Sequence, residues 1–518
     1  MPDGVRLYTC GTVPPSGEKR PIIVMRNPYC PDGPGDMAAF VSEGATAPEA
    51  ARRGYAFVLQ HCRGTGGSEG VFEPYTNERA DGLAFLDWLR RLPFYNGEIY
   101  VAGGSYLASV HYAYLNTNPA DVKGAYLMVQ DCDRYNVLFR NGFFKIGLHG
   151  NWFLSHYYKK DATLPRDASV LLSDIPLLDF ARRYWGRDVP LFSEPFRHPD
   201  RDDPWWRTTE ANGCFREALS RSTMPVLLST GFYDLYTDGV NEMWRSLPPE
   251  RRANSTLVID AAGHGGDSPL TGPDAPASAN FQGGARRNGV PSMYDWFDAI
   301  RTGRPCAGVK LGTAKYFALW ENRWITAAAL VDGPRTVALP LGKGEVSWIY
   351  DPRRELPNFP GSGGLCFGDM QAQPEPDFRD DVRSVLLPPL TERLDVRGRP
   401  KARLRVKSDC EDTAFYIRLS VDKGDGVWWL LRDDIVAIST FAPDYKPGTW
   451  IDVHYRFADH AFRLEKGDRL RVDLASACQL FTPHTNVRGL QSAIRNPLIA
   501  ENAVRLEESE LLFHVLEN

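Results

Sequence analysis

The stretch EIYVAGGSYLASVHYAYL, residues 98–115, decides the fold. Residues 98–102 form a short β-rich run, Gly103 and Gly104 follow, and a helix-like apolar run comes after Ser105. A serine on a tight turn between a strand and a helix is the geometry of a nucleophile elbow, whose hydroxyl projects from the carboxyl edge of a sheet. The helix that follows would offer backbone N–H groups and the positive end of its dipole to a developing oxyanion.

On its own, this stretch leaves two interpretations open. The pattern G-x-S-x-G is only half met, because Leu107 stands where the second glycine would be. A Gly-Gly-Ser turn can also do no more than connect a strand to a helix. The choice between a nucleophile and a connecting turn therefore depends on the rest of the chain.

Strand-like and helix-like segments alternate on both sides of that turn. Short β-rich runs stand at 21–26 (PIIVMR), 55–60 (YAFVLQ), 225–229 (PVLLS) and 255–260 (STLVID), and residues 81–92 have the periodicity of an amphipathic helix. Such alternation predicts a largely parallel sheet with helices on both faces, the architecture of an α/β-hydrolase domain.

The chain has 518 residues, which is too long for a single hydrophobic core, and three parts of different character are expected. We place the α/β-hydrolase domain at 1–135 and 223–305. Residues 136–222 lose the strand pattern and gain aromatic side chains, which indicates an inserted helical cap. Residues 306–518 alternate apolar and polar residues at period two between Gly, Pro and Asp, which predicts a C-terminal all-β sandwich or jelly roll.

Two more strand ends supply the partners that a serine nucleophile needs. Asp234 follows the strand-like run 225–229, and His264 follows the run 255–260 in a glycine-flanked loop. A base and an acid that orients it are required because a serine hydroxyl alone is a poor nucleophile. The order Ser, Asp, His is the one expected of this fold, so Ser105, Asp234 and His264 are the predicted catalytic residues. Asp238 is the competing acid.

Composition excludes several classes of function. The formal net charge is −5 and no long basic run is present, so neither nucleic acid nor an anionic membrane is an expected partner. No apolar run approaches the ~20 residues of a membrane-spanning helix, and the N-terminus has no signal-peptide pattern. The nine cysteines stand singly, which favours free thiols and a cytoplasmic location.

Several motifs in register resemble the CocE/NonD family, the cocaine esterase and X-Pro dipeptidyl-peptidase group of serine hydrolases. They span nearly the whole chain: PDGVRL at 2–7, MRNPY at 25–29, CRGTGGSEG at 62–70, GGSYLA at 103–108, GFYD at 231–234, GHGG at 263–266 and GDRLRVDLASACQLFTPHTN at 467–486. The resemblance implies an oxyanion hole made by the backbone N–H of Tyr106 and the hydroxyl of Tyr29. Tyr29 also follows a predicted strand and is therefore expected at the same sheet edge as Ser105.

The chain departs from the family pattern at three places. Ala108 replaces a glycine, and His61 stands where an acid is usual. The run Leu235-Tyr236-Thr237 lacks the acidic residues with which amino-ester hydrolases bind a substrate ammonium group. Specificity for such substrates is therefore not expected.

A cap beside the carboxyl edge of the sheet can supply an apolar acyl or aryl pocket. The aromatic residues proposed for it are Phe143, Phe144, Trp152 and Phe153. They could equally be core, and the sequence leaves this open. Clusters such as His198 with Asp200, Asp202 and Asp203 are read as solvent loops, so no metal site is expected.

The expected reaction is acyl transfer to water by a serine hydrolase, which needs no metal or organic cofactor. Ester hydrolysis is ranked first, and amide or X-Pro peptide hydrolysis second. A non-catalytic binding protein on the same scaffold is the rival from another class. The expected partner is a small ester or amide, and a homodimer is compatible with the sequence.

Overall fold

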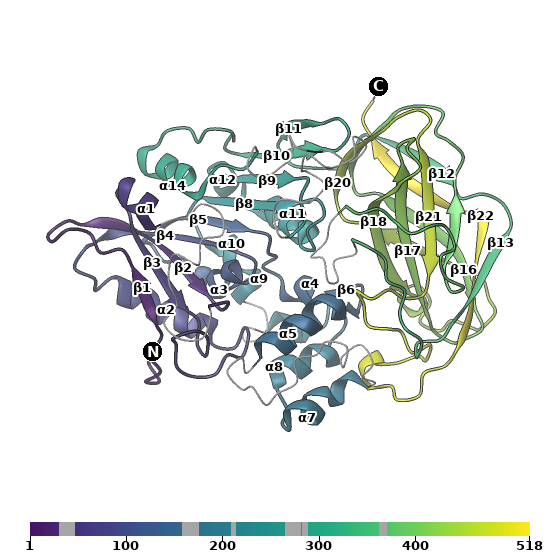
Figure 1. Ribbon diagram of the computed structural model, residues 1–518, viewed down its shortest axis with the longest axis horizontal. Coiled ribbons are helices and arrows are strands. Elements are labelled where there is room, and N and C mark those ends of the chain that lie inside the picture. Colours follow the sequence, from purple (N-terminus) through teal and green to yellow (C-terminus); the bar gives the residue numbers. More distant parts are fainter. Residues whose placement is uncertain are drawn as a thin grey trace.

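The structure is a computed structural model that describes residues 1–30, 47–157, 176–208, 214–264, 281, 289–361 and 370–517. Figure 1 shows three parts: an α/β domain on the left, a helical cap at the lower centre and a β-sandwich on the right. The two chain termini lie at opposite ends of the molecule.

The α/β domain is built on a nine-stranded sheet, counted over the described residues, with strand order β1-β3-β2-β4-β5-β8-β9-β10-β11. Neighbouring strands from β3 to β10 are parallel, and β1 and β11 pair antiparallel at the two edges. This sheet confirms the predicted α/β-hydrolase fold. The strands are β1 (Thr9–Gly11), β2 (Arg20–Asn27), β3 (Ala56–His61), β4 (Tyr95–Gly104), β5 (Val122–Met128), β8 (Val226–Gly231), β9 (Thr256–Asp260), β10 (Thr313–Ala318) and β11 (Arg323–Ala327).

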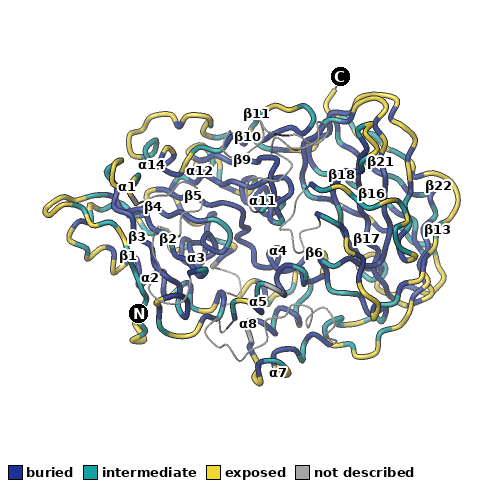
Figure 2. Tube along the Cα trace, viewed as in Figure 1, coloured by how far each residue is buried: buried dark blue, intermediate teal, exposed yellow. Residues whose placement is uncertain are grey.

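Helices cover both faces of this sheet, which explains why its central strands are apolar throughout. Helices α2 (Glu78–Leu89) and α3 (Tyr106–Leu115) bury Phe85, Leu86 and Val110 on one face. Helices α1 (Ala47–Arg52) and α14 (Met293–Thr302) bury Trp296 and Phe297 on the other. The central strands are buried along their length, and exposed residues gather at the loops (Figure 2).

The sheet continues past residue 305, where the sequence placed the end of the α/β domain. Strand β10 pairs parallel with β9, and β11 pairs with β10, so the sheet extends to Ala327. The burial of β10 alternates over its first residues, a pattern shared with the sandwich strands. Periodicity alone therefore could not assign β10 and β11 to the correct sheet.

The inserted part is mostly helical and holds a small aromatic core in which Phe144, Phe153, Phe192 and Phe196 meet edge to face or stacked. It also contains a two-residue hairpin, β6 (Phe139–Arg140) with β7 (Phe143–Phe144). The other elements are α4 (Arg134–Leu138), η3 (Ile146–Gly150), α5 (Asn151–His156), η4 (Leu177–Asp179), α7 (Phe180–Trp185), α8 (Pro190–Ser193), η5 (Glu194–Arg197), η6 (Pro204–Arg207), α9 (Cys214–Arg216) and α10 (Ala218–Arg221).

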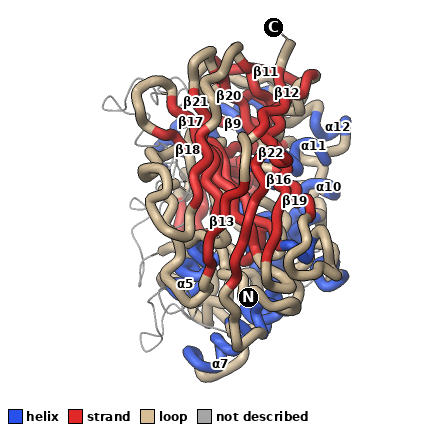
Figure 3. Tube along the Cα trace, turned by 90° about the vertical axis from the view of Figure 1, so that its right-hand side faces the viewer, coloured by secondary structure: helices blue, strands red, loops and turns tan. Residues whose placement is uncertain are grey.

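The C-terminal part is all-β, as predicted. One sheet contains β12 (Arg335–Pro340), β13 (Glu345–Tyr350), β15 (Leu394–Gly398), β16 (Lys401–Ser408), β19 (Ile451–Arg456), β20 (His460–Leu464) and β22 (Ala500–Val515). The facing sheet contains β14 (Arg383–Leu386), β17 (Ala414–Asp422), β18 (Trp428–Ala437) and β21 (Arg469–Ala475). Figure 3 views this sandwich from its outer side.

The remaining helices of the described part are α11 (Thr237–Ser246) and α12 (Pro249–Arg252) between β8 and β9, with η11 (Ile438–Thr440) and η12 (Gln491–Ala493) in loops of the sandwich. Within the described residues, no helix is long and apolar enough to cross a membrane. Those residues also contain no cluster of His, Cys, Asp and Glu that could hold a metal ion.

Candidate active site

Ser105 occupies a strained turn between β4 and α3. Its backbone angles are φ 54° and ψ −131°, a combination that costs free energy for any residue with a side chain and that persists where function requires it. Gly103 makes the turn possible, because a Cβ there would lie 2.3 Å from the carbonyl oxygen of Leu107. The first glycine of the motif is therefore the one that the tight turn requires, and Leu107 is compatible with it.

We expect Gly103→Ala to distort the elbow. The added methyl meets backbone atoms of α3 rather than a movable side chain, so overpacking should destabilise the fold by about 1–3 kcal/mol. A shift of Ser105 by ~1 Å should also lower kcat about 10²-fold. Urea unfolding and ester hydrolysis measure the two effects. Gly104→Ala is the matched control, because its Cβ would meet nothing closer than 3.5 Å. Equal behaviour of the two variants would contradict this account.

The structure brings the three predicted catalytic residues together from three strand ends. The Nε2 atom of His264 lies 2.8 Å from Oγ of Ser105, and its Nδ1 atom lies 3.2 Å from Oδ2 of Asp234. The Asp234 carboxylate is fully buried and accepts a hydrogen bond from the backbone N–H of Tyr236 at 2.7 Å. Asp238, the competing acid, instead accepts hydrogen bonds from Arg140 and from the backbone of Asp459. Gly265 and Gly266, which follow His264, lie outside the described residues.

The two predicted oxyanion donors converge on Ser105. The Tyr29 hydroxyl is within hydrogen-bonding reach of the Ser105 side chain and the Tyr106 backbone, and it accepts from Nε1 of Trp152 at 3.3 Å. Burial raises the pKa of Tyr29 to about 12, although these hydrogen bonds act in the opposite direction. The phenol therefore keeps its proton, and remains a donor, at neutral and moderately alkaline pH.

The side chain of Tyr106 is anchored away from the reacting atoms. Its hydroxyl donates to Oε1 of Glu78 at 3.0 Å and accepts from the backbone N–H of Tyr75 at 2.7 Å. Glu78 is in turn ion-paired with the buried Arg26 at 3.0 Å. This arrangement holds the start of α3, and with it the Tyr106 N–H, in a fixed place. This arrangement could not be predicted from the sequence, because no local pattern links Arg26 to Glu78.

Of the four aromatic residues proposed for a substrate pocket, the structure brings only Trp152 to Ser105 and its neighbours. Its ring lies 5.2 Å from that of Tyr106. Phe144 and Phe153 stack on each other at 6.3 Å within the buried core of the cap. Phe143 packs against Phe481 of the sandwich. Phe153 is a core residue, whereas Phe143 and Phe144 also line a cavity of about 850 Å³, whose described wall does not include Ser105.

Two aromatic side chains that were not predicted from the sequence lie beside the catalytic residues. The ring of Tyr236 meets that of His264 edge to face at 5.4 Å, and its hydroxyl lies 3.4 Å from Nε2 of His149. Tyr75 lies 5.0 Å from Tyr106 and 6.4 Å from Trp152, between ring centroids. The position of Tyr236, two residues after Asp234, was the available signal.

A cavity of about 850 Å³ lies where the α/β domain, the cap and the sandwich meet. Its wall includes Asp234, Tyr236 and Asp238 together with Arg140 and Arg432, but among the described residues neither Ser105 nor His264. The cavity thus borders the loop that carries the acid, and not the reacting hydroxyl. It is large enough for a small organic molecule.

The departures at Ala108 and His61 are accommodated. Ala108 is fully buried in the first turn of α3. His61 accepts a hydrogen bond from the backbone of Gly67 at 3.2 Å, and the nearby Arg63 pairs with Asp81 at 2.6 Å. The loop that the usual acid would support is therefore held by other contacts.

Two models of protein families match this chain. Residues 3–266 match the model of the X-Pro dipeptidyl-peptidase (S15 family), which is more than half of the chain. The chain belongs to the S15 family. Residues 321–507 match the model of the X-Pro dipeptidyl-peptidase C-terminal non-catalytic domain. The S15 enzyme described here is thus a serine hydrolase with a CocE/NonD-type architecture.

Individual relatives of this S15 hydrolase include an esterase and a peptidase. Cocaine esterase from Rhodococcus sp. (strain MB1 Bresler) is 26% identical, over 84% of this chain and 81% of the relative. An aminopeptidase from a Thaumarchaeota archaeon has a TM-score of 0.78 at 18% identity, over 100% of this chain and 95% of that chain. An α-amino acid ester hydrolase has a TM-score of 0.77 at 19% identity, over 99% and 95%. These two structures share the fold.

Proposed function

We propose that this S15 hydrolase cleaves carboxylic esters through an acyl-enzyme on Ser105. The observation that carries the proposal is the 2.8 Å contact between His264 Nε2 and Ser105 Oγ, at a strained elbow that two oxyanion donors face. A connecting turn would need neither the base nor the strain. A binding protein on the same scaffold would not need them either.

The geometry allows the usual two half-reactions. His264 takes the proton of Ser105 as the hydroxyl oxygen attacks the ester carbonyl, and the buried Asp234 stabilises the imidazolium that forms. The tetrahedral oxyanion accepts hydrogen bonds from the Tyr106 N–H and the Tyr29 hydroxyl. His264 then gives its proton to the leaving alkoxide, and water removes the acyl group by the same steps.

The side chains around the nucleophile favour an apolar acyl or aryl group. Trp152, Tyr75 and Tyr236 present aromatic surface near Ser105 and His264, and no carboxylate stands in the run 235–237 after the catalytic acid. A substrate ammonium would find no acidic partner in that run. The similarity to a cocaine esterase points the same way. The S15 family match favours X-Pro peptide hydrolysis as the second candidate.

Two measurements test the proposal. A fluorophosphonate probe should label the protein, and peptide mass spectrometry should locate the adduct at Ser105. Nitrophenyl acetate and nitrophenyl benzoate should be hydrolysed with a higher kcat/KM than Gly-Pro-nitroanilide. Turnover of the anilide alone would refute ester hydrolysis in favour of X-Pro peptide hydrolysis. An adduct at any other residue would refute the assignment of Ser105 as the nucleophile.

We also propose that the enzyme works in the cytoplasm on a small-molecule ester, without nucleic acid or membrane as partner. The seven cysteines whose side chains are described are free thiols, which suits a reducing compartment. A homodimer is the proposed assembly, and analytical ultracentrifugation tests it.

A further inference from the structure

The loop that carries Asp234 is held from the C-terminal sandwich on the side that precedes the acid. The ring of Phe232 packs on that of His460 at 4.6 Å. The Tyr233 hydroxyl donates to the carbonyl oxygen of Leu430 in β18 at 3.0 Å, and the Arg432 guanidinium lies 5.5 Å over the Tyr233 ring. The two residues directly before Asp234 are therefore both fixed by the sandwich.

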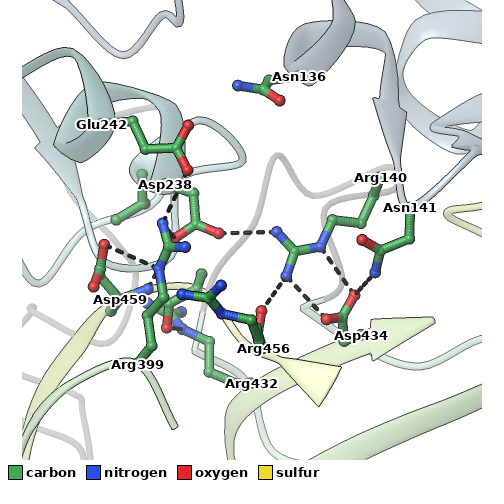
Figure 4. Close-up of polar contacts among 12 residues, drawn as sticks. Asn136, Arg140, Asn141, Asp238, Glu242, Arg399, Arg432, Asp434, Arg456 and Asp459 are labelled. Carbon is green, nitrogen blue, oxygen red and sulfur yellow. Dashed lines mark hydrogen bonds and ion pairs between the residues drawn. The ribbon is translucent and has the colours of Figure 1, made fainter. Parts of the chain in front are cut away.

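The same loop is held on the side that follows the acid, through Asp238 in the first turn of α11. Arg140 of the cap donates from Nη1 to Asp238 at 2.9 Å, and with Nε and Nη2 it donates to both carboxylate oxygens of Asp434 in β18, each at 2.9 Å. Figure 4 shows this guanidinium between the two carboxylates. The backbone N–H of Asp459 donates to the other oxygen of Asp238 at 2.9 Å. Arg140 thus joins all three parts of the molecule at one point.

The turn from Asp234 to α11 is short and internally bonded. The Thr237 hydroxyl contacts the carbonyl oxygens of Gly231 at 2.5 Å and of Asp234 at 2.7 Å. A displacement of Asp238 would therefore be passed to Asp234 within one helical turn. The cavity of about 850 Å³ lies against one side of this loop, so polar contacts supplement the packing of its buried aromatic residues there.

The contacts of Asp238 with two arginine residues determine its charge. Burial alone would raise the pKa of Asp238, but Arg140 and Arg399 hold it below its usual value, so the carboxylate is ionised. The Asp434 side chain is almost completely buried, and this burial raises its pKa, whereas the partly exposed Arg140 guanidinium acts in the opposite direction through two hydrogen bonds.

We propose that the C-terminal sandwich positions the catalytic acid Asp234, through Tyr233 on one side and the Asp238–Arg140–Asp434 chain on the other. Arg140 is the positioning residue that couples cap and sandwich to the acid. The sandwich, although it touches no reacting atom, thereby contributes to the orientation of His264. This inference rests on the proposed function where it is tested by kcat, but not where it is tested by the NMR resonance of the proton between His264 and Asp234.

The test compares Arg140→Met with Arg463→Met. Arg463 is a matched control, since it also bridges two carboxylates, Asp395 of the sandwich at 2.6 Å and Glu321 of the β10–β11 turn at 3.0 Å, with a similar exposure. In Arg140→Met, kcat per active site, counted by titration, should fall about 10²-fold with KM changed by no more than about two-fold. Arg463→Met should keep the wild-type kcat, even if its melting temperature falls by as much as that of Arg140→Met. Arg140→Lys should recover part of the loss.

A second readout needs no substrate. The proton between His264 Nδ1 and Asp234 should give a low-field NMR resonance that is lost or shifted in Arg140→Met and unchanged in Arg463→Met. Wild-type kcat and resonance in Arg140→Met, or equal losses in both variants, would overturn the proposal. If the wild type hydrolyses neither ester nor anilide, the proposed function fails, while the resonance still decides this inference.

A third variant covers the case in which Arg140→Met does not fold. Tyr233→Phe removes only the hydrogen bond to Leu430 and tests the other side of Asp234. A smaller loss of kcat and a shifted resonance support the proposal. Wild-type values for both would overturn it.

Discussion

Ser105→Ala and His264→Ala should each lower kcat for a nitrophenyl ester about 10⁶-fold, and Asp234→Asn should lower it about 10⁴-fold. The difference follows from the geometry. Ser105 and His264 exchange the proton directly at 2.8 Å, whereas Asp234 acts on the imidazole from behind at 3.2 Å. An amide at 234 would favour the wrong tautomer of His264 without removing the base.

Stopped-flow assays with active-site titration measure these losses. The double variant Ser105→Ala/His264→Ala should lose no more than either single variant, because the residues act as one unit. Ser220→Ala, a change at an exposed serine of α10, is the control and should behave as the wild type. Asp238→Asn should lose no more than about 10²-fold, since Asp238 only positions the acid. A larger loss for Asp238→Asn than for Asp234→Asn would exchange their roles.

Tyr29→Phe should lower kcat about 10²- to 10³-fold with little change in KM, because one oxyanion donor is typically worth ~3–4 kcal/mol of the barrier. The phenylalanine ring keeps the edge-to-face contact with His156, whose centroid lies 5.4 Å away, so the loss reports the hydroxyl. The acceptor becomes charged only in the transition state, which explains why substrate binding is spared.

Steady-state kinetics on nitrophenyl acetate test this expectation. The matched control is Tyr95→Phe, at the other end of β4, where the lost hydroxyl donates to Asp121 at 2.7 Å and lies beside Arg90. The Tyr95 variant should keep the wild-type kcat. An unchanged kcat in Tyr29→Phe would show that the Tyr29 hydroxyl is not the second oxyanion donor beside the Tyr106 N–H.

The parts of the site that lie close together in the chain were predictable from sequence. The strand, turn and helix around Ser105 occupy eighteen consecutive residues, 98–115, and their pattern is local. Asp234 and His264 could be placed because parallel strands end at one edge of a sheet, so strand ends far apart in the chain converge there. Tyr29 came from the family resemblance and from its place after a strand.

Other parts could not be predicted because they depend on packing between distant segments. Residues 143, 144, 152 and 153 are all aromatic, yet only Trp152 contacts the oxyanion residues Tyr29 and Tyr106 beside Ser105. The alternation in β10 suited a sandwich strand, but its pairing with β9 places it in the α/β sheet. Glu78 behind Tyr106 had no sequence signal at all.

The sequence by itself determined the fold class, the elbow at Ser105 and the order of the three catalytic residues, because each depends on short-range pattern or on strand order. Only the tertiary structure decided which aromatic side chains meet the reacting atoms, where the sheet ends, and how Arg140 connects the cap and the sandwich to the acid. Those contacts join residues that are distant in the chain, such as Arg140 and Asp238, which are 98 positions apart. Such contacts exist only once three cores have packed against one another.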